Sequence, residues 1–190
     1  MYLIFVIKGM SKLFTIMILI FIPIVTANAQ HVGSMNWSSE EDFKQDEKYI
    51  VEDILWLEEN PLASLTNDTK AISSYVLNWL SNTPYISVTL DEIFLEGISN
   101  NKKYKYAEKF RVTYLFGKSL YEIQHQGNDD EVMASARGIE GMAKVYMELK
   151  KSDPSAKNRL LEKYAKMVKN NRIESYVRTE IQKNKTAAIN

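Results

Sequence analysis

The chain contains no cysteine in its 190 residues. This absence excludes a disulfide scaffold, a cysteine nucleophile and thiolate ligation of a metal ion. It also excludes a bacterial lipoprotein, because lipid attachment requires a cysteine at the cleavage point. The folded domain must therefore be stabilised by apolar packing and by helix caps.

Glycine and proline are also scarce, with seven and four residues in the whole chain. Leucine, isoleucine, lysine and glutamate are abundant instead, which favours helices over sheets. The Lys-, Asn- and Ile-rich composition is typical of proteins from AT-rich bacteria. The sequence contains no convincing internal repeat of the kind that builds helical solenoids.

Histidine occurs only twice, as His31 and His125. The sequence contains no His-x-x-x-His or His-Glu-x-x-His pattern, so it predicts no zinc site and no metal cofactor. His125 follows the end of a predicted helix, where an imidazole complements the helix dipole more often than it performs chemistry. We therefore expect no catalytic histidine.

No charge of one sign dominates the chain, which carries 24 basic and 24 acidic residues. Nucleic-acid recognition usually requires a basic face, and the short basic stretch at 101–105 is too local to supply it. We expect no nucleic-acid partner and no bound cofactor.

The N-terminal segment resembles a secretory signal peptide in its layout. An apolar run of about 13 residues, Leu13–Val25, follows Lys8 and Lys12 and is shorter than a membrane span. Ala27-Asn28-Ala29 predicts cleavage after Ala29, so 1–29 would be removed, and Met10 is the better start. The alternative is an uncleaved N-terminal anchor helix. After cleavage we expect no membrane association and a net charge near −2.

The remaining chain predicts one all-α domain over 37–183, preceded by a flexible leader at 30–36 and followed by a disordered tail at 184–190. Apolar residues recur with helical spacing in six to seven segments. The expected helices cover about 38–60, 66–82, 89–100, 102–126, 129–151, 154–169 and 172–183. The turn around Gly127 makes 102–126 and 129–151 an antiparallel hairpin at the centre of the fold.

Two features of the segment 129–151 have structural explanations. Gly138 and Gly141 lie inside the helix, which predicts that another backbone approaches closely there. We expect Gly138→Leu to be destabilising and Gly138→Ala to be mild. The charges between Arg137 and Glu148 alternate at i, i+3 and i+4, which predicts a solvated face with weak ion pairs.

Carboxylates are plentiful, and a glycosidase needs only two of them. Most of the acidic clusters lie in first helical turns, where capping explains them, and Glu58-Glu59 at a helix end is expected to be solvated. Arg111, on a narrow polar stripe of a very apolar helix, is a candidate anion-binding residue. Its structural alternative is a partly buried ion pair, for which Glu108 is the candidate partner.

The aromatic residues supply the other candidate site. The surplus aromatic side chains of Trp37, Tyr49, Trp56 and Tyr85 could line a groove for a peptide, a glycan or a lipid, although simple packing is the alternative. We expect neither catalytic nor metal-ligating residues among them.

These observations favour an exported, non-enzymatic helical interaction or structural module, working in a periplasm or outside a cell with an unknown protein or small-molecule partner. A helical pocket for a small apolar or amphipathic ligand is the second hypothesis, because Met- and aromatic-rich interiors adapt readily. A carboxylate-dependent hydrolase is the third.

Overall fold

The computed structural model describes residues 35–63, 67–100 and 103–188. The predicted signal peptide, 1–29, and most of the leader lie outside the described residues. Over the described part of the chain, seven α-helices follow one another: α1 (Glu40–Glu59), α2 (Asn67–Asn82), α3 (Glu96–Ser99), α4 (Ala107–Gln124), α5 (Glu131–Ser152), α6 (Arg159–Lys169) and α7 (Ile173–Ala187). Two 3-10 turns, η2 (Glu92–Phe94) and η3 (Pro154–Ala156), precede α3 and α6. The described chain contains no strand, which confirms the all-α prediction.

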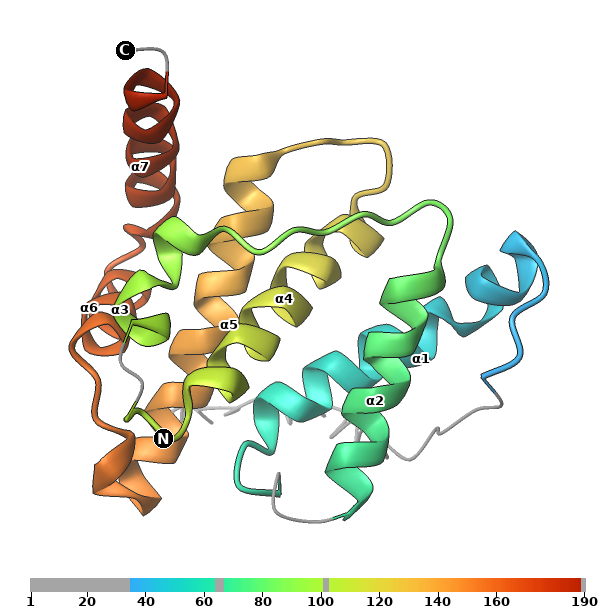
Figure 1. The fold of residues 1–190 in the computed structure, drawn as a ribbon, viewed down its shortest axis with the longest axis horizontal. Helices are drawn as coiled ribbons and strands as arrows, with labels where there is room; N and C mark the ends of the chain where they lie inside the picture. Colours follow the sequence, from blue (N-terminus) through green and yellow to red (C-terminus); the bar gives the residue numbers. More distant parts are fainter. Residues whose placement is uncertain (1–34, 64–66, 101–102, 189–190) are drawn as a thin grey trace, which may run out of the picture.

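The α4–α5 hairpin is the most extensive helix pair and lies between the two ends of the molecule (Figure 1). Gly127 turns the chain with a φ of +81°, a conformation that glycine adopts without strain. Asp130, rather than the expected Asn128, caps α5 by accepting the amide hydrogens of Val132 and Met133 at 3.1 Å. The predicted antiparallel hairpin is therefore confirmed, with its cap shifted by two residues.

The two helices of the hairpin cross at a pair of glycines. A Cβ atom on Gly117 would lie 2.8 Å from the carbonyl oxygen of Arg137 and 2.9 Å from the Cα of Gly138. A Cβ atom on Gly138 would lie 2.8 Å from the ring and from the carbonyl oxygen of Tyr114. The expected close backbone approach at Gly138 is confirmed, but even alanine is too large there, which corrects the prediction of a mild Gly138→Ala effect.

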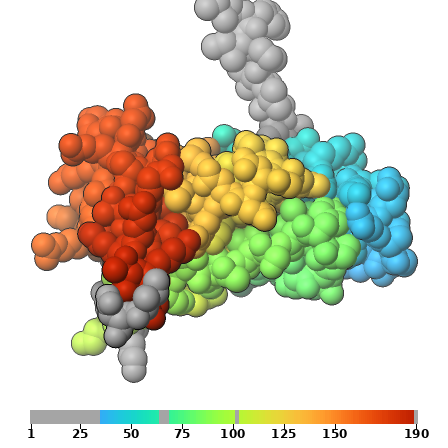
Figure 2. All heavy atoms as spheres, turned by 90° about the horizontal axis from the view of Figure 1, so that it is seen from above, coloured from blue at the N-terminus to red at the C-terminus, as the bar shows by residue number. Residues whose placement is uncertain are grey.

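Two hydrophobic clusters flank the hairpin. The first joins α1 and α2 to one side of α4 and is built around Ile54, Tyr75 and Trp79. The second joins η2, α3, α6 and α7 to α5 and the remaining face of α4, around Phe94, Tyr146 and Tyr164. Because α5 contacts α1, α4, α6 and α7, it is more central than α4. Figure 2 shows the α6–α7 end and the α1–α2 end on opposite sides of α5.

The segment between α2 and α4 differs most from expectation. One continuous helix was predicted over 89–100, but the backbone stays non-helical to Asp91 and only short η2 and α3 follow. The side chain of Asp91 is bound to three residues of the hairpin, and its extended backbone prevents an earlier helix start. In Figure 1 this connector crosses over the hairpin from α2 to α3.

Two helix boundaries also differ. Helix α4 begins at Ala107 instead of 102, because the side chains of Tyr104 and Tyr106 bind the Ala156 carbonyl and Asp153. Helix α7 runs to Ala187, four residues into the expected disordered tail. Within the described ranges, no helix is long and apolar enough to cross a membrane.

Candidate functional site

The four candidate aromatic residues lie in the α1–α2 half of the molecule. Trp37 stacks on Phe43 with ring centroids 5.2 Å apart, and its indole Nε1–H donates to Asp46 at 2.7 Å. Tyr85 packs edge-on against Trp79. Both therefore belong to one aromatic cluster that closes the end of the first core.

The other two candidate aromatics are half-buried on α1, outside these contacts. The Nζ atom of Lys48 lies 4.5 Å from the centroid of the Tyr49 ring, and Trp56 is half-buried near the end of the helix. None of the four lines the hollow along α6 or the smaller hollow between α2 and α4. The structure uses Trp37 and Tyr85 for packing, and the predicted groove stays a prediction.

Arg111 occupies a partly buried position, with 31% of its side chain exposed. Its Nη1 lies 3.1 Å from Glu92 Oε1 and donates to Ser99 Oγ at 3.0 Å. The partner is therefore Glu92 and not Glu108. Because Glu92 begins η2 and Ser99 ends α3, Arg111 ties both ends of this short segment to α4.

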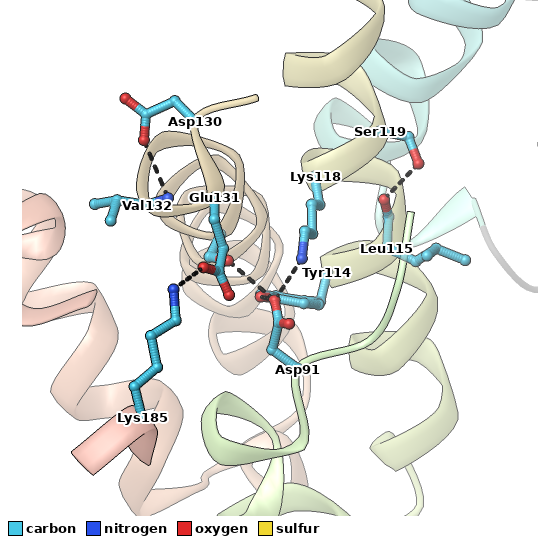
Figure 3. Close-up of polar contacts among 10 residues, drawn as sticks. Asp91, Tyr114, Leu115, Lys118, Ser119, Asp130, Glu131, Val132 and Lys185 are labelled. Atoms are coloured by element: carbon cyan, nitrogen blue, oxygen red, sulfur yellow. Dashed lines mark hydrogen bonds and ion pairs between the residues drawn. The ribbon is translucent and has the colours of Figure 1, made fainter. Parts of the chain in front are cut away.

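A second polar centre fixes the start of the same segment (Figure 3). Asp91 Oδ2 accepts from the Tyr114 hydroxyl at 2.5 Å, from Lys118 Nζ at 2.6 Å and from Ser135 Oγ at 3.0 Å. The Lys118 side chain is only 7% exposed, and Tyr114 and Ser135 are fully buried. Sequence reasoning missed this centre because its four members come from the connector, α4 and α5.

The Asp91 centre is a structural contact that holds the connector against the α4–α5 hairpin. Burial, followed by the negative charge of Asp91, raises the pKa of Tyr114 far above its usual range, so the phenol remains a hydrogen-bond donor. A buried lysine–aspartate pair is costly to break, since the remaining charge loses both water and its partner. Because Tyr114 and Ser135 are closed to solvent and Lys118 is nearly so, the cluster holds the connector in place.

A buried ion pair joins the other half of the hairpin to α1. Arg137 donates to both oxygens of Glu58, at 2.9 Å from Nη1 and 2.8 Å from Nη2, and Glu58 is only 3% exposed. A Cβ atom on Gly141 would lie 2.5 Å from Glu58 Oε1, so glycine there makes room for this pair. The prediction of a solvated Glu58 is therefore wrong. The buried carboxylate of Glu58 explains why position 141 is a glycine, since any side chain there would collide with it.

The alternating charges of α5 do not form the predicted ladder along one helix. Arg137 reaches Glu58 and Lys144 reaches Glu59, both on α1, while Glu148 binds Lys151. The first contact is a buried bidentate pair, which is stronger than an exposed one. These charges therefore dock α5 onto α1.

A large open hollow lies along α6, at the opposite end of the molecule from α1. Its volume is about 1180 Å³, and it is lined by Gly97 of α3, by residues 157–160, by the outer side of α6 and by Arg172. The base of α6 is fixed by Asn158, whose Oδ1 accepts the amide hydrogens of Leu160 and Leu161 at 2.9 and 3.2 Å. Asn158 Nδ2 donates to the Gly97 carbonyl, which joins the two walls.

Five cations line this hollow: Lys157, Arg159, Lys163, Lys166 and Arg172. Over the described residues, no ion pair involves any of them. Lys163 lies 4.1 Å from the ring centroid of Tyr176, a cation–π contact that leaves its charge uncompensated.

One acid, Glu162, lines the hollow, and it is already engaged. It accepts from the Tyr146 hydroxyl at 2.7 Å and from Lys150 at 3.0 Å. These two contacts, the tyrosine first, lower its pKa, so it stays ionised and bound to them near neutral pH. The hollow is therefore a cationic surface whose chemistry favours binding an anion. No group of three potential metal ligands occurs within the described ranges.

The signal for this site was present in the sequence. Arg159, Lys163, Lys166 and Lys169 recur at 4-3-3 spacing, opposite the buried side chains of Leu161, Tyr164 and Ala165. The segment 157–172 holds six basic residues and one acid, a net charge of +5. This local excess of positive charge does not show in the net charge of the whole chain, which is zero.

The comparisons with known proteins add no further guide to the function. The chain matches no family model, no curated protein and no solved structure at the level required for a significant match.

Proposed function

We propose that the protein is a non-enzymatic binding module that receives an anionic ligand in the α6 hollow. The observation that carries this proposal is the gathering of five cations without an acidic partner around one concave surface. Like charges gathered around one hollow repel one another, and a bound anion relieves that repulsion. Lysine and arginine are also the residues that bind carboxylate, sulfate and phosphate groups most effectively.

The groups around the hollow suit binding better than bond cleavage. Glycosidic hydrolysis requires two carboxyl groups facing one substrate, whereas Glu162 is alone in this hollow and engaged with Tyr146 and Lys150. Elsewhere Glu58 and Glu59 bind separate partners on α5. The binding module is therefore favoured over the carboxylate-dependent hydrolase.

We further propose that this module is exported from a bacterial cell as a soluble chain beginning at Gln30. The support is the signal-like layout of 1–29 and the absence of cysteine, which excludes lipid attachment. Expression of the full chain in a bacterial host and N-terminal sequencing of the periplasmic product test this. Gln30 as the first residue is expected, and retention of Leu13–Val25 would contradict it.

The binding proposal is tested by titrating isotope-labelled protein with hexyl sulfate and following backbone amide resonances. We expect saturable shifts within 157–172 that weaken as the salt concentration rises. The double variant Lys166→Gln/Arg172→Gln should bind about tenfold more weakly, because two nearby cations are removed. Lys48→Gln/Lys70→Gln, which removes the same charge from α1 and α2, is the matched control and should bind as the wild type does.

Two results would contradict the proposal. One is the absence of saturable shifts within 157–172 for any anion tested. The other is equal affinity for hexyl sulfate and for uncharged hexanol, since the cations would then contribute nothing to recognition.

A further inference from the structure

We propose that the natural ligand of the α6 hollow is a single-chain amphiphile, an anionic head group on an apolar chain, and not a bare inorganic anion. This inference rests on the proposed function and names its ligand class. It is carried by three features of the hollow: its size, the apolar side chains along one flank, and the firmly anchored wall of α3 that adjoins them.

The size of the hollow exceeds what an inorganic anion needs. Its volume of about 1180 Å³ is slightly above the range found for pockets that hold molecules of drug size, roughly 300–1000 Å³. A sulfate or phosphate ion would occupy a small part of it. The remaining space must therefore be filled by another part of the ligand or by water.

The apolar flank is formed by Leu160 and Met167. These residues are seven positions apart on α6, so they lie two turns apart on one side of the helix, separated by about 10.5 Å along its axis. Both are half-buried against the second core and retain exposed surface toward the hollow. They form a strip on which an extended alkyl chain can lie.

The cations adjoin this strip along the same helix. Lys163 lies between Leu160 and Met167 in sequence, and Lys166 precedes Met167. A head group held by Lys166 and Arg172 therefore leaves its chain next to the apolar side chains. This juxtaposition of charge and apolar surface is the recognition pattern of an amphiphile.

The wall formed by α3 adjoins the Leu160 end of the strip. A Cβ atom on Gly97 would lie 3.1 Å from the Cβ of Leu160, so α3 approaches α6 at the van der Waals limit. The segment that carries Gly97 is anchored before it by Asp91 and across its length by Arg111. Because the walls are fixed in advance, little ordering is required when a chain binds.

The charge distribution favours a small amphiphile over an extended polyanion or an anionic bilayer. The five cations of the hollow lie at the α6 end of the molecule, whereas α1 at the other end has nine acids against two lysines. A long polyanion or a flat membrane surface extending toward α1 would meet repulsion. A discrete ligand within the hollow would meet the five cations, and the one acid there, Glu162, is already bound to Tyr146 and Lys150.

The experiment compares inorganic sulfate with butyl, hexyl and octyl sulfate, each below its micelle concentration, on the mature protein. We expect affinity to rise with chain length, by at most about fourfold for each methylene that leaves water. Met167→Gln should flatten this rise while leaving the affinity for butyl sulfate nearly unchanged. Met147→Gln, at an exposed methionine of α5 outside the hollow, is the matched control and should retain the rise.

The outcomes separate this inference from the proposed function. Equal affinity for sulfate and octyl sulfate would overturn the amphiphile and leave the anion site standing. A chain-length dependence that survives in Met167→Gln would also overturn it, by placing the chain elsewhere. Co-sedimentation with phosphatidylglycerol vesicles, without saturable binding of alkyl sulfates, would replace it with a membrane surface. Failure of every anion to bind would end both proposals.

Discussion

The α1–α2 end and the α6–α7 end of this molecule use charge in opposite ways. At the first end, three acids of α1 are committed to the fold: Glu58 binds Arg137, Asp46 accepts from Trp37 and Tyr75, and Asp42 completes a capping box with Ser39. At the second end, five cations face a hollow without an acidic partner. Charges that have no structural partner are the ones left available for a ligand.

The two cores differ in the same way. The first core is closed over by aromatic side chains, with Phe43 in contact with both Trp37 and Trp79. The second core is covered by α6, whose inner side is apolar and whose outer side is basic. The first end is therefore built for stability, and the second combines a buried face with a surface suited to recognition.

The largest expected effect on the free energy of unfolding lies at the α1–α2 end. Arg137→Met leaves Glu58 buried without its partner, so we expect a loss of about 3–5 kcal/mol in the free energy of unfolding. Lys144→Met removes an exposed ion pair on the same helix and should cost at most about 1 kcal/mol. Urea unfolding measures both variants. Equal losses would show that Glu58 is hydrated, contrary to the geometry.

The next effect tests the crossing of the hairpin that separates the two ends. Gly138→Ala places a methyl group 2.8 Å from Tyr114, so the helices must move apart or the ring must shift, and we expect a loss of about 1–3 kcal/mol. Gly97→Ala, whose added atom meets only the Leu160 side chain at 3.1 Å, should cost less. A larger loss of stability in Gly97→Ala than in Gly138→Ala would show that the α4–α5 crossing is not the tighter contact.

Asp53 gives the first end a distinctive pH dependence. It is only 1% exposed, its Oδ2 has no hydrogen-bond partner among the described residues, and burial raises its pKa to about 7. Because the folded pKa exceeds the usual value near 3.9, the protonated form stabilises the fold, and this stability is lost as the pH rises from about 4 to 7.

The variant Asp53→Asn should remove that dependence. Relative to the wild type, we expect its free energy of unfolding to increase with pH by at most about 1.4 kcal/mol per unit up to pH 7 and to level off above pH 8. Urea unfolding at pH 5, 6, 7 and 8 provides the comparison. Parallel pH profiles for the two proteins would show that Asp53 is ionised in the fold.

Elements stabilised by local sequence could be predicted, whereas those decided by distant contacts could not. The helices corresponding to α1, α2 and α5 and the turn at Gly127 follow from apolar spacing and from backbone preference. The break at Asp91 was not predictable, because it depends on Tyr114, Lys118 and Ser135 from two later helices. The burial of Glu58 likewise depends on Arg137, 79 positions away.

The candidate site was missed for a different reason. For Arg111, the structural alternative of a partly buried ion pair is confirmed, although its partner is Glu92, and its anion-binding role stays a prediction. The basic stripe of α6 was visible in the sequence, but a charged helix face is usually only a solvated face. Its significance depends on Gly97 and Arg172 forming a hollow around it, which the sequence alone does not reveal.

The most direct test of the contrast between the two ends is to measure stability and binding together in Lys166→Gln/Arg172→Gln. If these cations serve a ligand and not the fold, urea unfolding should show stability unchanged or raised by a few tenths of a kcal/mol, as cation repulsion falls, while hexyl sulfate binds about tenfold more weakly. A loss of stability above about 1 kcal/mol with unchanged binding would contradict the account, because it would show that the α6 cations stabilise the fold.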